Sequence, residues 1–434
     1  MAWTIALSLL TIFTMIGASL FKPNLKIHKL SINTYWIIPS LGALILLSAS
    51  LITFPEILAG LTADTTINPL KILALFLSMT LMSIFLDEVG LFRFLATYAL
   101  KKAKINQLTM FITLYALVSF LTIFTSNDII ILTFTPFICY FAKRAKIDPI
   151  PYLFASFVAA NTWSMMLIIG NPTNIYLASS HGILFLEYAK VMILPTIFAS
   201  LTSFGVLLLI FQKKLSSPIS EEVETAAIKD KFMLFTGLIA LGGCTFLLTI
   251  SNYIELDMYL ITLIFATSLL VVILLYKAFK KSKPTEVAMT LRRLPWDLIP
   301  FIISMFVIVL ALDKHGATRF LASFFSNSQP IVKYGISSFL IANFINNIPM
   351  SVLYSSVTSY ASSIVTTEAV YASIVGSNLG AFLTPMGALA GMMWMGLLKS
   401  HGVTFSFLSF VKYGVLPAFV ALAAALLGLF IVFI

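Results

Sequence analysis

A single acidic residue interrupts an apolar run in the first half of the chain. Residues 124–131 read FTSNDIII, so Asp128 follows Ser126 and Asn127 and precedes three isoleucines. An ionisable side chain inside a bilayer costs roughly 2.5–3.5 kcal/mol on the insertion scale and is a sign of an ion or substrate pathway. Asp128 could couple transport to H⁺ or Na⁺, bind a cargo directly, or cap a helix. Among these three roles we favour ion coupling.

Three other apolar stretches carry amide and hydroxyl side chains beside residues that end helices. They lie at residues 346–347, 170–174 and 384–385. Proline removes a backbone donor, and the peptide groups freed at each break must find other partners. Helix N-termini there could hold an anion or a polar oxygen, whereas freed carbonyl groups could hold a cation. The alternative is that these amides only join neighbouring helices.

The candidate residues fall into three groups. The expected substrate-binding side chains are Ser126, Asn127, Asn171, Thr173, Asn174, Asn346, Asn347, Ser377, Asn378 and Thr384. The expected helix-breaking residues are Gly170, Pro172, Pro349 and Pro385. Asp128 alone is assigned to ion coupling. Asn161 and Asn378 are weaker candidates as direct ligands, because they could instead satisfy the backbone near the breaks. No residue is assigned a catalytic or metal-binding role.

The elements that position these residues must be membrane-spanning helices. The chain has 434 residues, of which 60% are hydrophobic and 10% charged. Repeated apolar runs of about 20 residues match a hydrocarbon core of about 30 Å, so the predicted fold is an all-α polytopic membrane protein. The first run has no basic segment or cleavage site and is expected to be a retained helix. We expect spanning helices at residues 2–20, 33–54, 67–86, 150–180, 184–212, 232–250, 257–277, 296–313, 368–398 and 404–434.

Two further apolar stretches, residues 105–142 and 330–365, are predicted to be re-entrant hairpins. The first is cut at Asp128 and its neighbours, and the second is cut at residues 346–347. The arm at residues 129–141 would form only about 20 Å of helix, too short to span the bilayer. A helix that ends inside the membrane must turn back or line a cavity, so we expect both tips near the midplane.

The basic residues predict an orientation for the chain. Lysine and arginine flank the first hairpin on both sides, at residues 101–104 and 143–146, so both of its ends are expected in the cytoplasm. With both termini outside, all but five of the 27 Lys and Arg residues fall on the cytoplasmic side. The exceptions are Lys71, Lys190, Lys314, Arg319 and Lys333. The basic residues that give the net charge of +10 lie in short loops between apolar spans, and this placement argues against nucleic-acid binding.

The two halves of the chain resemble each other. LDEVGLFRFLA at residues 86–96 and LDKHGATRFLA at residues 312–322 share Leu, Asp, Gly, Arg, Phe, Leu and Ala. Three later matches follow in the same order: FTSNDI with FINNIP, Asn161 with Asn378, and GNPTN with LTPMG. We therefore expect an inverted repeat of about five plus five transmembrane helices, with two re-entrant hairpins and two broken helices around a midplane site.

This repeat predicts the division of the chain. The first repeat covers residues 1–212, with a hairpin at 105–142 and a broken helix at 150–180. A polar cytoplasmic linker follows at residues 213–231. The second repeat covers residues 232–434, with a hairpin at 330–365 and a broken helix at 368–398. In the LDxxGxxRFLA motifs, we expect Asp87 and Asp313 to cap helices and both arginines to lie among lipid headgroups.

The remaining reactive side chains do not form a catalytic pattern. Cys139 and Cys244 lie in separate apolar runs, and the four histidines fall in predicted loops. A secondary carrier is therefore favoured over an intramembrane enzyme, and no cofactor is expected beyond a coupling H⁺ or Na⁺. A channel is a further alternative, but an inverted repeat with paired hairpins favours alternating access.

The chain resembles the ArsB/NhaD arsenite-permease family of the ion-transporter superfamily. The resemblance covers nearly the whole chain and is densest at residues 86–92, 124–137, 292–312, 346–353 and 368–394. It implies ten spans, two hairpins, a prokaryotic inner (cytoplasmic) membrane, and efflux of arsenite or antimonite in exchange for protons. The residues that it implies at the translocation site are Asn127, Asp128, Asn346, Asn347, Thr384 and Pro385.

The chain departs from that family's pattern at several positions. Asn161 and Asn378 stand where the arsenite permease has aspartate, Ala381 and Phe382 stand where it has Pro-Lys, and residues 170–174 read GNPTN where it has Ser-Asn-Leu-Val-Asn. A ring of uncharged Asn, Ser and Thr suits arsenite, which is a neutral trihydroxide at pH 7. The nearest alternatives are a Na⁺/H⁺ antiporter and a transporter of inorganic anions or dicarboxylates. The sequence leaves open both a homodimer and an association with an ATPase.

Overall fold

The computed structural model describes residues 2–22, 24–27, 30–62, 68–102, 106–216, 227–228, 230–251, 254–325 and 328–434. Within these ranges, eight segments are helical, long and apolar enough to cross a membrane. This confirms an α-helical multi-pass membrane protein. The long helices are α1 (Ala2–Phe21), α4 (Pro69–Glu88), α6 (Gln107–Phe124), α10 (Phe185–Phe211), α11 (Lys231–Ile250), α12 (Met258–Phe279), α13 (Thr285–Arg293) with α14 (Leu298–Lys314), and α20 (Phe407–Phe433).

Shorter helices connect or interrupt the long ones. They are α2 (Thr34–Ser48), α3 (Phe54–Thr62), α5 (Leu91–Lys102), α7 (Asn127–Ala145), α8 (Ile150–Trp163), the 3₁₀ helix η1 (Ile168–Gly170), α9 (Pro172–Ser180), α15 (Ala317–Ser323), α16 (Pro330–Ile345), α17 (Asn347–Ser359), α18 (Ser363–Gly380) and α19 (Leu389–Ser400). The strands β1 (Asn24–Ile27) and β2 (Leu30–Asn33) pair antiparallel, with Asn24 opposite Asn33. This two-stranded hairpin is the one departure from an all-helical chain among the described residues.

Two predicted elements differ from the structure. The helix expected at residues 33–54 ends at Ser48, because Ser50 has a φ of +56° that an α-helix cannot contain, and α3 begins only at Phe54. The helix after the first tip, α7, has 19 residues rather than 13, which is about 28 Å of helix. An arm of this length nearly matches the hydrocarbon core, so the prediction that it is too short to span the bilayer is wrong. The interruption before it is present, since Thr125 and Ser126 are extended between α6 and α7.

The repeated LDxxGxxRFLA motif ends one helix and begins another in each half, as predicted. In the first half, α4 stops at Glu88, Gly90 has a φ of +93°, and α5 follows. In the second half, α14 stops at Lys314, Gly316 has a φ of +75°, and α15 follows. A positive φ is readily adopted by glycine alone, which explains the glycine in both turns.

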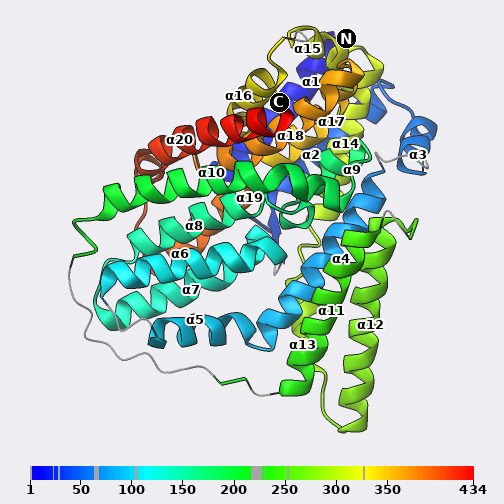
Figure 1. Ribbon diagram of the computed structural model, residues 1–434. Coiled ribbons are helices and arrows are strands. Elements are labelled where there is room, and N and C mark those ends of the chain that lie inside the picture. Colours follow the sequence, from blue (N-terminus) through cyan, green and yellow to red (C-terminus); the bar gives the residue numbers. More distant parts are fainter. Residues whose placement is uncertain are drawn as a thin grey trace.

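Helices of the two halves exchange partners. The α2 helix packs along α14, whereas α12 packs along α4. The hydroxyls of Ser40 and Ser304 are 2.9 Å apart in the first pair, and Lys71 lies 3.5 Å from Asp257 in the second. The second arm of each predicted hairpin contacts the predicted broken helix of the other half, α7 with α19 and α17 with α9. The long helices α10 and α20 run side by side (Figure 1).

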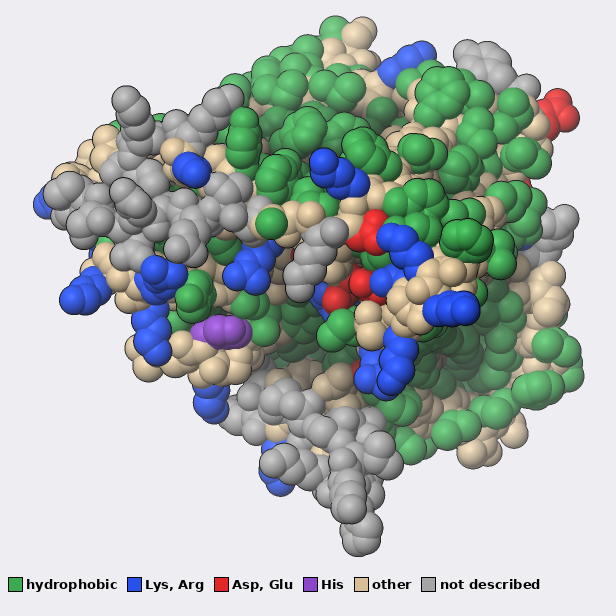
Figure 2. All heavy atoms as spheres, turned by 90° about the horizontal axis from the view of Figure 1, so that it is seen from below, with side chains coloured by type: hydrophobic (Ala, Val, Ile, Leu, Met, Phe, Trp, Pro, Cys, Tyr) green, Lys and Arg blue, Asp and Glu red, His purple; other side chains and the backbone are tan. Residues whose placement is uncertain are grey.

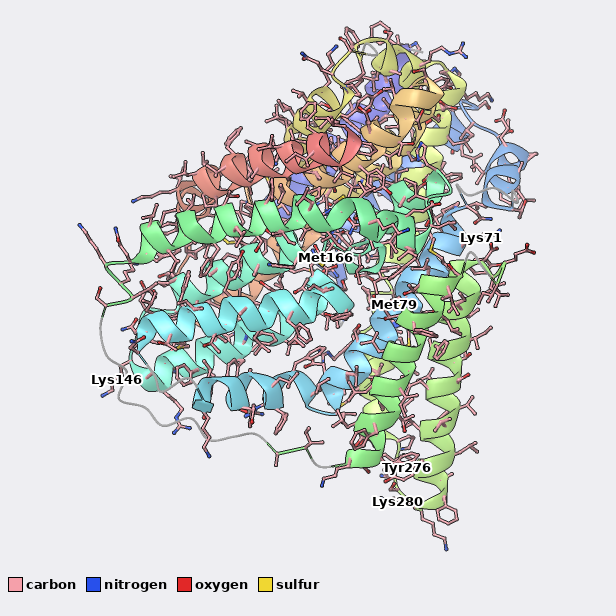
Figure 3. All side chains as sticks on the ribbon, viewed as in Figure 1. Lys71, Met79, Lys146, Met166, Tyr276 and Lys280 are labelled. Atoms are coloured by element: carbon pink, nitrogen blue, oxygen red, sulfur yellow. The ribbon has the colours of Figure 1, made fainter. Side chains whose placement is uncertain are left out.

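Both ends of the chain lie in the upper part of the molecule (Figure 1). Figure 3 shows Lys71 at the upper end of α4, Lys280 at the lower end of α12, and Lys146 at the left of the molecule, after the end of α7. The α4 helix runs between the upper and lower parts of the molecule, and 78% of its span is buried, against 28% for α12. The predicted linker at residues 213–231 lies for the most part outside the described residues.

Candidate functional site

The first hairpin tip places buried polar atoms at the start of α7. Asn127 donates from Nδ2 to Asn161 Oδ1 at 3.1 Å. Asn161 in turn donates to the Phe157 carbonyl within its own helix at 2.9 Å. The Ser126 hydroxyl and Asn127 Oδ1 are buried and have no hydrogen-bond partner among the described residues. These two oxygens are therefore available to a ligand.

The break in the first broken helix is held by an amide from the other half. Asn378 of α18 donates from Nδ2 to Asn174 Oδ1 at 2.7 Å. Its Oδ1 accepts hydrogen bonds from Asn171 Nδ2 at 3.0 Å and from the Ser164 hydroxyl at 3.1 Å. Asn171 also caps α9, because its Oδ1 accepts from the Thr173 backbone and hydroxyl, each at 3.1 Å.

This buried hydrogen-bond network connects α8, α9 and α18 and does not form an open binding surface. Asn171, Thr173, Asn174 and Asn378 are each at most 1% exposed. Asn174 also donates to the Ser164 carbonyl at 2.8 Å. A β-carbon on Gly170 would collide with that same carbonyl oxygen, which explains the glycine before the helix-breaking Pro172. The side chains of the three asparagines thus form hydrogen bonds with one another and with the backbone groups freed at the break.

The second hairpin tip is bonded to the second break. Asn346 has a φ of +73° and donates from Nδ2 to the Met386 carbonyl at 3.1 Å. The Asn347 backbone donates to the Gly387 carbonyl at 3.1 Å. Asn347 Oδ1 and, on α18, the Ser377 hydroxyl are buried without a hydrogen-bond partner in the described part of the chain. Pro349 is the third residue of α17 and lies in its first turn, where the fixed φ of proline suits the helix.

A wide cavity of about 1590 Å³ reaches the first tip and the second break. Ser126, Asp128 and Pro385 line it, so these three predicted residues share one space. The charged side chains that also line the cavity are Arg292 and Arg293 in the last turn of α13, Asp297 just before α14, and Lys399 at the end of α19. Figure 2 shows Lys and Arg side chains gathered around a hollow of the lower face, with acidic side chains among them.

Asp87 and Asp313 are not helix caps, contrary to the prediction. Asp87 lies in the last turn of α4, accepts from the Thr133 hydroxyl of α7 at 2.9 Å, and pairs with Arg293 at 2.7 Å. Asp313 lies in the last turn of α14 and accepts from the Ser356 hydroxyl of α17 at 3.0 Å. Each aspartate thus ties a long helix to the second arm of its hairpin.

The neighbouring charges are reversed between the two motifs. Glu88 of α4 pairs with Arg293 at 2.5 Å. At the matching position Lys314 pairs with Glu56 at 2.7 Å, and hydrogen bonds from Lys314 and Thr53 lower the pKa of Glu56 to about 2. Both pairs join the end of a long helix to a short helix, α13 or α3.

Two polar residues of the site were not singled out from the sequence. Asn343 Oδ1 accepts from the Thr384 backbone at 3.1 Å and from its hydroxyl at 2.7 Å, so it fixes the second break. Ser164 bonds Asn378 at the first break. Asn343 is a polar residue inside the apolar segment FLIANFI, residues 339–345, and this position in the sequence could have identified it as a candidate. Among the described residues, no cluster of His, Cys, Asp and Glu could hold a metal ion.

Known transporters match the chain in sequence and in fold. The "Arsenical pump membrane protein" of Yersinia enterocolitica is 26% identical over 378 residues, covering 82% of this chain and 86% of that protein. The solved structure of Neisseria gonorrhoeae MtrF, described as illuminating a class of antimetabolite efflux pumps, has a TM-score of 0.55 at 14% identity and covers 98% of this chain and 94% of that one. The Alcanivorax borkumensis YdaH transporter also has a TM-score of 0.55 at 14% identity, covering 100% and 98%.

These matches confirm the resemblance to arsenical pumps and indicate a membrane transporter rather than an enzyme. Residues 34–376 match the family described as citrate transporter, CitMHS. The match includes both hairpin tips and the first break, although it ends before the second break. The chain therefore belongs to the CitMHS citrate transporter family.

Proposed function

We propose that this chain is a proton-coupled secondary active transporter that exports arsenite or antimonite across a prokaryotic cytoplasmic membrane. The observation that carries the proposal is the position of Asp128 in the wide cavity, beside the Ser126 hydroxyl and the broken helix at Pro385. Asp128 makes no ion pair with any described side chain. A carboxylate in such a place must find a cation or a proton whenever the cavity closes around it.

An inverted repeat with re-entrant hairpins supports alternating access at this site. The exchanged contacts of α2 with α14 and of α12 with α4 are those that two interlocked, equivalent halves would make. The reversed ion pairs of Glu88 and Lys314 fit the same relation, with one pair on each face of the membrane. In the orientation that we propose, both termini lie outside and the cavity opens to the cytoplasm.

Although Arg292 and Lys399 also line the cavity, the acid at the first tip favours an uncharged cargo there. Arg293 is already neutralised by Asp87 and Glu88. Asp297 accepts a hydrogen bond from Asn33 at 2.6 Å, and Asp128 adds a second acid to the lining. A polyanion close to Asp128 would meet like charge in a poorly solvated place, whereas a neutral trihydroxide would not. The unpartnered oxygens of Ser126 and Asn127 could accept hydrogen bonds from its hydroxyls.

Exchange follows from competition for one cavity. With Asp128 deprotonated toward the cytoplasm, the trihydroxide binds at the first tip and donates hydrogen bonds from its hydroxyls to the carboxylate, which compensates the charge while the site closes. When it opens outward, the cargo leaves and Asp128 takes a proton, which permits return. Each state is stabilised only when the carboxylate charge is compensated or removed, so the proton gradient sets the direction of net transport.

Citrate is the second candidate cargo, because the family that matches residues 34–376 is described as citrate transporter. Arg292 and Lys399 are exposed at the cavity and could attract an anion. Citrate requires a cation to offset Asp128, so a citrate carrier of this construction would couple to H⁺ or Na⁺ through the same residue.

Uptake into everted membrane vesicles separates these cargoes. With an acid interior, antimonite and arsenite should accumulate, and the accumulation should collapse when the pH gradient is dissipated. Citrate and sodium should not exchange. Gradient-driven citrate uptake without arsenite or antimonite uptake would overturn the proposed cargo, while the absence of any gradient-driven flux would overturn proton coupling.

A further inference from the structure

A second, small cavity borders the wide one. It has a volume of about 20 Å³ and includes Asn346 of the second hairpin tip in its lining. Four residues line both cavities and so form the partition between them: Ser19, Tyr35, Leu389 and Met392. The first tip, with Ser126 and Asp128, therefore faces one side of the partition, and the second tip faces the other side.

Tyr35 is the polar aromatic side chain of this partition. It is the second residue of α2, and its ring meets Phe301 of α14 edge-on, with the centroids 5.4 Å apart and the planes at 84°. Its hydroxyl makes no hydrogen bond to a described residue. A tyrosine hydroxyl both donates and accepts, so Tyr35 can bond a hydroxylated ligand on its open side while its ring closes the path.

The small cavity cannot accept a cargo as it stands. A space of about 20 Å³ holds about one water molecule. Arsenous acid and antimonous acid each have four non-hydrogen atoms and need several times that space. From the wide cavity they could reach Asn346 if a partition side chain moved, and Tyr35 is the large polar one among the four. Citrate, with thirteen non-hydrogen atoms, would require a much larger opening.

We propose that Tyr35 is a gate and specificity residue, whose side chain turns to admit a small neutral trihydroxide from the wide cavity to the second hairpin tip. This rests on the proposed function. Asn346 Nδ2 and Oδ1 each have one hydrogen-bonding position left after their bonds to Met386 and Ile348. The cargo would be handed from the oxygens of the first tip to this amide, with the Tyr35 hydroxyl bonding it in between.

Two variants separate the hydroxyl from the ring in transport assays. Tyr35→Phe should raise KM for antimonite roughly 3- to 10-fold, the value of one lost hydrogen bond, with little change in kcat. Tyr35→Ala should remove the partition and allow larger hydroxylated solutes such as glycerol to leak through. An unchanged KM in Tyr35→Phe, together with unchanged selectivity in Tyr35→Ala, would overturn the role. If the wild-type protein moves no antimonite or arsenite, the proposed function itself has failed.

A second measurement tests the partition without any cargo. In a background with Cys139→Ala and Cys244→Ala, Asn346→Cys should react slowly with a small methanethiosulfonate reagent applied from the cavity side. If the partition is open about a tenth of the time, adding Tyr35→Ala should speed this labelling about tenfold. Ser126→Cys, on the near side of the partition, is the matched control and should label quickly in both backgrounds. Equal labelling of Asn346→Cys with and without Tyr35 would overturn the gate, and Tyr35→Leu repeats the test if the alanine variant does not fold.

Discussion

Asn378 Nδ2 lies 2.7 Å from Asn174 Oδ1, and this hydrogen bond joins the second half of the chain to the broken helix of the first. Both side chains are fully buried. The sequence favours Asn378 as much for satisfying groups at a break as for binding a cargo, and the geometry agrees with the former role. The amide holds α8, α9 and α18 together where the backbone of the first broken helix is not helical.

Replacing Asn378 by alanine should lower the free energy of unfolding by about 1–3 kcal/mol, because buried partners on Asn174, Asn171 and Ser164 lose their bonds. Thermal unfolding of the purified protein in detergent measures this effect. Asn378→Ala and Asn174→Ala should be clearly non-additive when combined. Additive effects would show that the two amides contribute independently, and the exposed Ser400→Ala serves as a control.

Replacing Asp128 by asparagine should abolish the response of transport to a pH gradient while leaving the folded protein intact. The substitution removes the titrating group but keeps the shape and a polar atom in the cavity. Antimonite uptake in everted vesicles, measured over a series of interior pH values, should rise with acidity in the wild type and be flat in Asp128→Asn. Asp257→Asn alters an exposed carboxylate at the start of α12 and should keep the wild-type response. A pH-responsive Asp128→Asn protein would contradict the coupling role.

The backbone of Asn346 is strained at a binding position. Its φ of +73° with a ψ of 153° is a region that essentially only glycine adopts freely, at a cost of about 1–3 kcal/mol for other residues. Asn346→Gly should therefore keep or raise the melting temperature while it weakens antimonite binding. Asn346→Ala should lower both. A glycine variant with unchanged transport would show that the amide serves only as glue between helices.

Close helix packing explains why Gly376 of α18 lacks a side chain. A β-carbon there would collide with the Ser338 hydroxyl and the Gly335 carbonyl of α16, and would lie 2.7 Å from the Phe339 nitrogen. Gly376→Ala should destabilise the protein by about 1–3 kcal/mol through forced separation of the two helices. Gly242→Ala in α11 meets nothing within 4 Å and should be neutral or stabilising. Equal melting temperatures for the two variants would contradict this account.

Helix positions were largely predictable, because apolar length and helix-ending residues act locally. The tip at Ser126 and the break at Gly170 both appear where glycine, proline and polar side chains cluster. The basic residues Lys143 and Arg144 predict a loop after residue 142, but α7 continues through them because basic side chains are favourable in a last helical turn. The roles of Asp87 and Asp313 could not be predicted for a different reason. Their hydrogen-bond partners, Thr133 and Ser356, lie about 45 residues away in the chain.

The sequence could not predict which candidate residues line a cavity and which are locked in the buried network at the first break. Sequence order places Asn171, Asn346 and Ser126 in equivalent breaks or tips, yet one is locked in a buried network and the others border different cavities. Which side of a helix meets water depends on packing between the halves. Tyr35 lies outside every repeated motif, so no internal comparison could have selected it.

The exchange of partners between the halves has a consequence for how the protein is made. The α4 helix is inserted before α12 has been synthesised, and α2 waits still longer for α14. Until the ribosome has completed the second half, the first half presents unpaired helix surfaces to lipid and to the insertion machinery. A gene divided within the segment between α10 and α11 should thus yield a functional carrier only when both pieces are expressed together, and either piece alone should be degraded.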